Sequence, residues 1–369
     1  MRLPPSCLAL AAAMLLPACS TLAPAPTQPT AAADTAPPAA TDAPASIAEA
    51  WIAQPRPADE IDSLATWPAP DGGHWLIATA KSSNTLAVYD ADTGDFLRSV
   101  GGPGDGPGRF RRPNGIAVFG DVLFVAERDG RRVQMLRLPD FAPLGDFGGD
   151  RLRVPYGLWV NEVRPDVVDV YVTDSYMADF RTGLLPPMDE LSGRVKRFRV
   201  DLSEQIPQAA WLDQFGDTGE AGALRMVESI AGDPAHDRLL IADEDRRVGS
   251  TLREYGLSDQ RYRGRSLPAF KSDAEGVALW ACTADSGYWI AVDQVRPSEF
   301  RVHDRRTLAL AGTFSGHVVA DTDGIVLQQD ASARFPAGAL FAQHDNVAVA
   351  AFDLRDVVRT LRLDPACAE

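Results

Sequence analysis

The chain has 369 residues, of which 51 are acidic and 36 basic, so its formal net charge is −15. Such acidity argues against nucleic acid as a partner, because proteins bind that polyanion through basic side chains that neutralise its phosphates. The chain has five histidines, and they lack the spacing of a zinc site. We therefore expect neither nucleic-acid binding nor zinc chemistry.

The N-terminus has the features of an export signal. Arg2 supplies a positive charge, and residues 7–16 form an apolar run that is too short to span a bilayer of about 30 Å. We predict that residues 1–18 are a lipoprotein signal peptide, because Leu16-Pro17-Ala18-Cys19 resembles the lipobox of bacterial lipoproteins. That resemblance implies lipidation of Cys19, with Ser20 favouring the outer membrane. The alternative is a plain cleavable signal followed by an incidental cysteine.

The segment from residue 19 to residue 50 is predicted to be a disordered linker. Residues 21–45 are almost wholly Ala, Pro, Thr and Asp, and such a stretch cannot bury enough apolar surface to fold. No apolar run of spanning length follows it, so we expect the lipid to be the only membrane attachment. The protein would then be exported, as an outer-membrane lipoprotein or in the periplasm, with residues 51–369 as its folded domain.

The folded part is predicted to be all-β. Its apolar segments are short, rich in β-branched and aromatic residues, and separated by Gly, Pro and Asp turns. Helical periodicity is nearly absent. The clearest predicted strands are residues 74–79, 85–89, 115–118, 122–126, 169–173, 238–242, 288–292 and 339–342.

These strands recur as a unit, which predicts the architecture. Segments such as PNGIAVFGDVLFVAERDG and VESIAGDPAHDRLLIADEDR share a first strand, a turn and a second strand that ends near an acid or arginine. The unit starts at Asp62, occurs six times, and has the spacing of about 45 to 60 residues expected of propeller blades. We predict a six-bladed β-propeller and expect a monomer, since two packed β-sandwiches would not explain the repeat. The second unit, GGPGDGPGRFRRPNGIAV, is similar to an NHL repeat.

Acidic residues fall at equivalent positions of this repeat. In a propeller the inner strands line a central channel and their loops form one rim, so equivalent residues lie near one axis. Close carboxylates repel one another unless a cation compensates, and calcium suits them because it accepts six to eight oxygen ligands. We predict a calcium site; the alternative is that each acid is a solvated turn residue or a strand-end cap. The acids are Asp59, Asp62, Glu228, Asp243, Glu244, Asp245, Asp273, Glu275, Asp321 and Asp323.

Over about residues 55–350 the chain resembles the β-propeller phytases, which are calcium-dependent six-bladed enzymes that hydrolyse phytate. The similarity is strongest in DAEGVALW, GYWIAVDQ and FPAGALFAQHD. The segment DEIDSLATW is similar to the family signature Asp-x-x-Asp-Asp-Pro-Ala-x-Trp, with Leu64 in place of the proline. The resemblance implies several bound Ca²⁺ ions. Their ligands would be Asp59, Asp62, Glu228, Glu244, Asp273, Glu275 and Asp323.

The resemblance also implies a phosphate-binding side of the site. Lys81, Arg128 and Tyr156 match residues of the family that bind the substrate and act in catalysis. Glu228 would be catalytic as well as a metal ligand, and Gln294 matches a substrate-binding glutamine.

One position departs from the family pattern. A lysine of the third blade is missing, since Asp174 and Ser175 stand where it is expected, and Lys196 or Arg181 would have to compensate. The implied activity is that of a calcium-dependent phosphomonoesterase of 3-phytase type. It would hydrolyse phytate or a related phosphorylated polyol with a water molecule activated by the metal.

Other functions fit the same sequence. A non-catalytic calcium-binding propeller lipoprotein would mediate protein or ligand binding in the cell envelope, and it would not need the missing lysine. A lactonase-like propeller would share the fold but would use a single Glu, Asn and Asp ligand set around one calcium. Individual residues also have simpler roles: Lys81 as a surface turn residue, and Arg128 as a partner for Glu127 or Asp129.

Cys282 and Cys367 allow two states. An oxidising periplasm permits a disulfide between them, and such a bond from a late strand to the C-terminus would clasp a closing structure. Two free buried thiols fit the sequence equally well.

Overall fold

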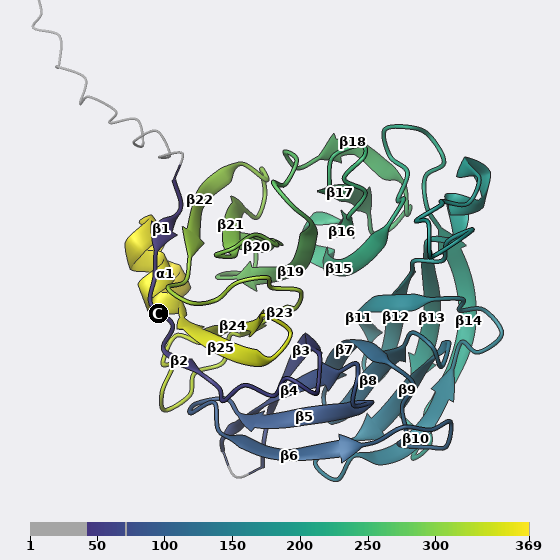
Figure 1. The fold of residues 1–369 in the computed structure, drawn as a ribbon, viewed down its shortest axis with the longest axis horizontal. Helices are drawn as coiled ribbons and strands as arrows, with labels where there is room; N and C mark the ends of the chain where they lie inside the picture. Colours follow the sequence, from purple (N-terminus) through teal and green to yellow (C-terminus); the bar gives the residue numbers. More distant parts are fainter. Residues whose placement is uncertain (1–42, 71, 369) are drawn as a thin grey trace, which may run out of the picture. The chain divides into compact units, whose positions relative to one another are not determined.

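The computed structural model describes residues 43–70 and 72–368, and these residues form a ring of six β-sheets (Figure 1). The predicted signal peptide, the lipidation site Cys19 and the linker up to residue 42 lie outside the described residues. Within the described residues, no helix is long and apolar enough to cross a membrane.

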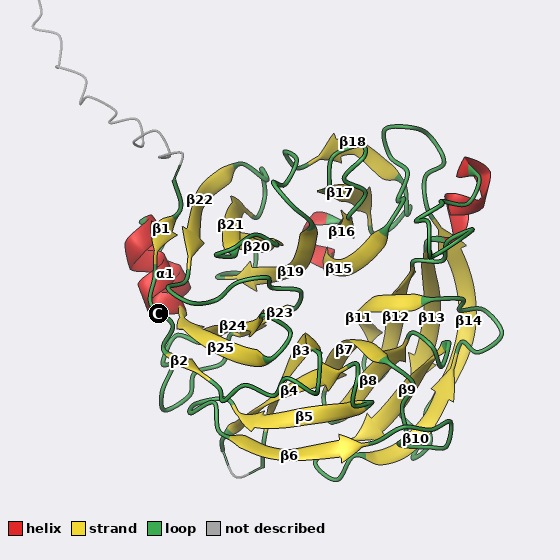
Figure 2. Ribbon diagram, viewed as in Figure 1, coloured by secondary structure: helices red, strands yellow, loops and turns green. Residues whose placement is uncertain are grey.

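Each sheet of the described chain is one blade with an antiparallel four-stranded core. Blade 1 consists of β3 (Ile61–Pro68), β4 (His74–Ala80), β5 (Thr85–Asp90) and β6 (Phe96–Gly101). Blade 2 consists of β7 (Pro113–Phe119), β8 (Val122–Glu127), β9 (Arg132–Arg137) and β10 (Ala142–Phe147). Blade 3 consists of β11 (Pro155–Arg164), β12 (Val167–Asp174), β13 (Val195–Asp201) and β14 (Gln208–Phe215). Blade 4 consists of β15 (Val227–Asp233), β16 (Arg238–Asp243), β17 (Thr251–Gly256) and β18 (Tyr262–Ser266). Blade 5 consists of β19 (Ala274–Ala281), β20 (Gly287–Asp293), β21 (Glu299–Asp304) and β22 (Leu310–Ser315). Blade 6 consists of β23 (Ile325–Gln328), β24 (Ala339–His344), β25 (Ala348–Asp353) and β2 (Trp51–Ile52). The six-bladed β-propeller predicted from the sequence is confirmed, with β3, β7, β11, β15, β19 and β23 innermost (Figure 2).

Burial varies across a blade in the way that its sequence predicts. The second strand β8, with the sequence VLFVAE, is buried along its whole length, because neighbouring blades cover both faces of a middle strand. The outer strand β6, with the sequence FLRSVG, is mostly exposed. The apolar core therefore lies between adjacent blades, where side chains such as Trp67, Ile77 and Leu123 form one of several clusters.

Small residues allow the inner strands to close around the axis. A Cβ atom added at Gly157 would lie 2.7 Å from the carbonyl oxygen of Glu228 in the next blade. A Cβ atom at Gly324 would lie 2.5 Å from the carbonyl oxygen of Asp62, across the junction between the last blade and the first. A side chain at either position would push neighbouring inner strands apart, so the narrow ring requires glycine there.

The N-terminal segment closes the ring. β1 (Ala45–Ser46) pairs in parallel with β22, and β2 pairs antiparallel with β25. Between them Ile47 is 4% exposed in the core of the last two blades. The predicted boundary at residue 51 is therefore wrong. The last residues of the predicted linker belong to the propeller, because they supply strand pairing and a buried side chain at the closing blades.

The C-terminal segment packs against the same two blades. β25 is followed by α1 (Leu354–Leu361), and the side chain of Asp353 caps the start of this helix. The sequence predicted almost no helix. α1 buries Leu354, Val357 and Val358. A disulfide joins Cys282 to Cys367, so the disulfide rather than two free thiols is present. Short 3-10 turns occur at η1 (Met188–Gly193), η2 (Pro234–His236) and η3 (Pro365–Ala368).

Candidate functional site at the axial mouth

In five of the six blades of the described chain, a bulge lies near the start of the inner strand. In β15 Val227 pairs with Asp243, and Ile230 pairs with Ile241. The inner strand therefore advances by three residues where its neighbour β16 advances by two. An extra residue of this kind redirects a side chain. The same shift occurs in β3, β7, β11 and β19. We call the residues at this position, just before the small residue of each inner strand, the first tier: Asp62, Asn114, Tyr156, Glu228, Glu275 and Asp323.

A second tier comes from the residue that follows the second strand of each blade. The backbone N–H of this residue donates to a carbonyl just before the inner strand, as Glu244 does to Met226 at 2.9 Å and Gln294 does to Asp273 at 3.0 Å. The same hydrogen bond occurs in the first three blades, whereas Asp345 in the sixth blade donates to Ala320, five positions before β23. The two tiers therefore meet at one mouth of the channel. The second tier consists of Lys81, Arg128, Ser175, Glu244, Gln294 and Asp345.

Three predicted metal ligands form a tight group at this mouth. Carboxylate oxygens of Glu228, Glu244 and Glu275 lie within 4.8 Å of one another. Burial, followed by the charge of the neighbouring acids, raises the pKa of Glu228 and of Glu244 well above the usual range. Burial also raises the pKa of Glu275 to about 7, although its hydrogen bond with Glu244 opposes the shift. These carboxylates therefore bind protons unless another cation occupies the group.

The group fits a calcium ion. Calcium binds oxygen at 2.3–2.6 Å, so two ligands of one ion are separated by about 5 Å at most. The spacing of 4.8 Å satisfies this limit with three hard carboxylate donors. Like charges held together in a partly buried place are costly without a compensating cation. Glu228, Glu244 and Glu275 are thus the residues of the described chain best placed to hold the metal.

Lys81 lies between the remaining first-tier acids. Its ammonium nitrogen is 3.1 Å from an oxygen of Asp62 and 3.8 Å from one of Asp323. Burial alone would lower the pKa of Lys81, but Asp62, Asp323 and Glu228 raise it above its usual value. Gln294 donates a hydrogen bond to Asp323. The mouth therefore contains a permanent positive charge held by two carboxylates.

Arg128 and Tyr156 come from the second and third blades and lie next to each other. The Nε atom of Arg128 donates to Asp129 at 2.8 Å, which agrees with the ion pair considered from the sequence. Burial and the charge of Glu228 raise the pKa of Tyr156 to about 12, although the adjacent Arg128 opposes the shift. Tyr156 therefore keeps its phenolic proton at neutral pH and can donate it in a hydrogen bond.

Two of the predicted metal ligands are held by arginines. Asp59 pairs with Arg56 at 2.5 Å, and Asp273 receives hydrogen bonds from Arg246, the longer at 2.6 Å. Asp273 still contributes to the raised pKa of Glu244 and Glu275, so it lies near the group. Asp59 shows no such link to the three glutamates among the described residues.

The third blade supplies no free cation to the mouth. Ser175 occupies the second-tier position there and is 5% exposed. Lys196 is buried, lies 3.2 Å from Asp174, and donates to the carbonyl of Gly193. The side chain of Arg181 is 93% exposed on the loop between β12 and β13. Neither basic residue replaces the missing lysine in this arrangement.

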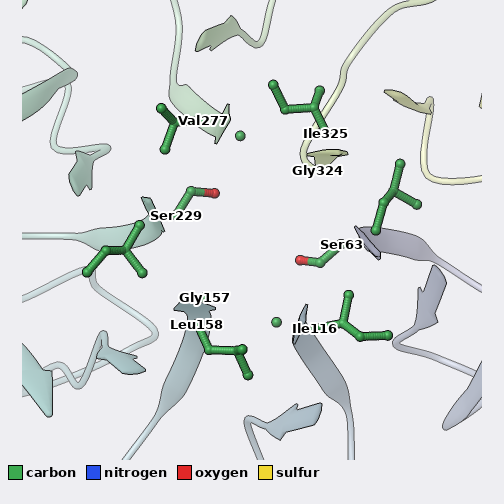
Figure 3. Close-up of a pocket in the computed structure, with 12 residues that line it drawn as sticks. Ser63, Ile116, Gly157, Leu158, Ser229, Val277, Gly324 and Ile325 are labelled. Carbon is green, nitrogen blue, oxygen red and sulfur yellow. The ribbon is translucent and has the colours of Figure 1, made fainter. Parts of the chain in front are cut away.

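The residues that follow the first tier in the chain line a small cavity at the centre of the ring (Figure 3). Its volume is about 70 Å³, which is room for water but not for a sugar phosphate. The small residues of the inner strands, such as Ser63 and Gly157, and the aliphatic residues that follow them, such as Leu158, line it. A sugar phosphate therefore does not fit inside this cavity.

Sequence reasoning missed two polar residues at this mouth. Asn114 completes the first tier and is 3% exposed, and the motif PNGIAV places it before Gly115 just as Glu228 stands before Ser229. Glu60 lies 3.7 Å from Lys81 and also binds Arg112. The repeat contained the signal for both residues, because Glu60 stands two positions before Asp62 as Asp273 stands two positions before Glu275.

The chain matches no protein-family model and no curated protein. Among solved structures it is similar to a hydrazine synthase from Kuenenia stuttgartiensis, with 12% sequence identity and a TM-score of 0.43. That match covers 85% of this chain and 81% of the other. The topology of the blades, and not this likeness, is the basis for describing the fold.

Proposed function

We propose that the protein is a calcium-dependent phosphomonoesterase of phytase type that acts on phytate or a related phosphorylated polyol. The observation that carries the proposal is the group of Glu228, Glu244 and Glu275, whose oxygens lie within 4.8 Å of one another. Lys81 interacts electrostatically with Glu228, and Arg128 lies beside Tyr156, which in turn interacts with Glu228. Acids that can hold a metal and cations that can bind a phosphate thus share one opening.

The chain's own residues would bind and orient the phosphate. Lys81 and Arg128 would donate to phosphoryl oxygens and stabilise the negative charge that grows in the transition state. The protonated hydroxyl of Tyr156 would donate to a third oxygen, and Gln294 would contact the substrate beside Asp323. Calcium bound by the carboxylates would supply Lewis acidity and the countercharge that brings a polyanion to an acidic protein.

The test is phosphate release from calcium phytate by the purified protein over a range of calcium concentrations. We expect turnover that requires calcium and that is lost in Glu244→Gln and Glu275→Gln. Glu204→Gln, at an exposed loop position, is the matched control and should keep full activity. Absence of turnover at every calcium concentration would contradict the proposed enzyme.

A second candidate function is a calcium-binding propeller without catalysis. The observation that favours it is Ser175, which leaves the third blade without a cation at the mouth. Under this function calcium would raise the melting temperature, by the equivalent of about 2.7 kcal/mol at a hundredfold excess over the dissociation constant. Phosphate release would then stay at background, which distinguishes the two functions.

We also propose that the protein is exported and anchored through Cys19. The support is the apolar run and the lipobox-like segment of the first nineteen residues. Cell fractionation should find the wild type in the membrane fraction. The Cys19→Ser variant should carry no lipid and should be absent from the membrane fraction. A wild type that remains in the cytoplasm would contradict the export signal.

A further inference from the structure

Four blades of the described chain share a buried carboxylate at one repeat position. It is the last residue of the second strand, opposite the residue that begins the inner strand. These side chains have no exposed surface, in contrast to the acids of the mouth. They are Glu127, Asp174, Asp243 and Asp293.

In the fourth blade this carboxylate joins two parts of the backbone. Oδ1 of Asp243 accepts hydrogen bonds from the N–H groups of Arg225 at 3.1 Å and Met226 at 2.9 Å. Oδ2 accepts from Nε of Arg253 in β17 at 2.9 Å. A charged arginine thus neutralises the acid, and the acid holds the segment that leads into β15.

The fifth blade repeats the arrangement. Asp293 accepts from the backbone N–H of Lys271 at 2.8 Å and Ser272 at 2.9 Å, and Arg301 neutralises it at 2.5 Å. Asp273 follows Ser272 directly in the chain, and Glu275 lies two positions after Asp273. The buried acid is therefore a recurring device of the blades rather than a feature of one loop.

The buried acid of each of the four blades links the segment before its first-tier residue to its second-tier residue. Met226 lies two positions before Glu228, and Glu244 follows Asp243 directly and donates its N–H to the carbonyl of Met226 at 2.9 Å. We propose that Asp243 is a positioning residue for the metal site, because it fixes the backbone that presents both Glu228 and Glu244. This inference rests on the calcium site of the proposed function and adds the group that keeps its ligands in place.

A tether is needed because the ligands repel one another. When they are ionised, as ligands of a metal ion must be, Glu228, Glu244 and Glu275 carry like charge within 4.8 Å, and repulsion between them would move their segments apart. Groups that hold metal ligands without touching the metal typically change its affinity about 10- to 100-fold when they are removed. Asp174 offers a comparison, since it holds the backbone of Arg153 and Val154 in the same way. Its blade presents Tyr156 and Ser175, which are not carboxylates.

The test compares Asp243→Asn with Asp174→Asn in the purified protein, using calorimetric calcium titration and thermal unfolding. Both variants should lose stability, since both weaken a buried ion pair. Asp243→Asn should bind calcium about 10- to 100-fold more weakly, whereas Asp174→Asn should stay within about twofold of the wild type. A milder variant, Arg253→Lys, keeps the charge but loses the fork of two donors, and it should weaken calcium binding without preventing folding.

The outcomes separate the inference from the proposed function. A wild type that binds no calcium overturns the proposed metal site, and the positioning role with it. If the wild type binds calcium and neither Asp243→Asn nor Arg253→Lys weakens it beyond Asp174→Asn, the positioning role is overturned while the proposed function stands. Equal weakening by Asp174→Asn would also overturn it, because the effect would then follow general destabilisation.

Discussion

Lys81 competes with any metal for Asp62 and Asp323, which lie 3.1 and 3.8 Å from its nitrogen. We expect Lys81→Met to lower the rate of phosphate release about 10²- to 10³-fold, as loss of a donor to transition-state charge does. The same variant should bind calcium more tightly, because a positive charge has left the mouth. Kinetics and calcium titration measure the two effects separately.

The control for this variant is Arg359→Met, which removes an exposed cation paired with Asp356 on α1. It should leave both quantities unchanged. If Lys81→Met lowered calcium affinity and activity together, Lys81 would act through the metal site rather than on the phosphate.

Glu275 should make the metal-free protein less stable as the pH rises. Its pKa of about 7 in the folded state exceeds the usual 4.5, so the folded state retains a proton that the unfolded state has lost. The contribution of Glu275 to the free energy of unfolding is therefore greatest below pH 4.5, and it is lost as the pH rises through 7. The loss is on the order of 3 kcal/mol for this single group.

The measurement is the melting temperature in a calcium chelator between pH 5 and 8, for the wild type and for Glu275→Gln. Burial lowers the pKa of His303 to about 4, so the contribution of His303 makes stability increase with pH below 6.5. This contribution is the same in both proteins and cancels in their difference. Added calcium should restore most stability at the alkaline end. Parallel curves for the two proteins would contradict the prediction.

Three adjacent acids show how far the sequence predicts this site. The repeat predicts that residues 243–245 end a strand near the axis, and that is where they lie. Glu244 faces the mouth, Asp243 binds the backbone of its own blade, and Asp245 pairs with Arg247 at 2.6 Å. Successive side chains alternate in direction, and their partners come from other strands and loops. Residue type alone could not separate the three roles, whereas the resemblance selected Glu244.

At the scale of the strand, the glycine before β23 determines how closely the last blade approaches the first. A Cβ atom at Gly324 would lie 2.5 Å from the carbonyl oxygen of Asp62 and 2.7 Å from Cα of Ser63. We expect Gly324→Ala to lower the free energy of unfolding by about 1–3 kcal/mol, the usual cost of overpacking. It should also weaken calcium binding, because the clash moves Asp62.

Gly106→Ala is the matched control, since an added Cβ atom there meets nothing within 4 Å. Chemical denaturation should find this variant within about 0.5 kcal/mol of the wild type. Equal stability of the two alanine variants would show that the inner strands can separate without cost.

The blades were predictable because each is built from neighbouring strands, and their turns and alternating burial are local properties. The closing strands were not. β1 has two residues and pairs with Phe314 and Ser315 near the other end of the chain, and so short a strand carries no periodic pattern. Its composition continues that of the linker, so only the pairing itself distinguishes Ala45 from the residues before it.

The whole ring is closed from both ends of the described chain. β1 and β2 add to the last two blades, and the C-terminal segment is bonded to Cys282 at the end of β19. Glu49 strengthens the first closure by accepting from the N–H groups of Val318 and Val319 at 2.9 and 2.8 Å.

The disulfide should stabilise the ring without affecting the mouth. It spans 85 residues, and a bond that closes a long loop in the unfolded chain contributes about 2–4 kcal/mol. Cys282 follows β19, whereas Glu275 lies near the beginning of that strand, so the bond and the mouth are at opposite ends of the blade. The double variant Cys282→Ser/Cys367→Ser should therefore lose this stability and keep its calcium affinity. Adding a reductant to the wild type should lower its melting temperature to that of the variant, and a loss of calcium binding in either case would contradict the separation of closure from site.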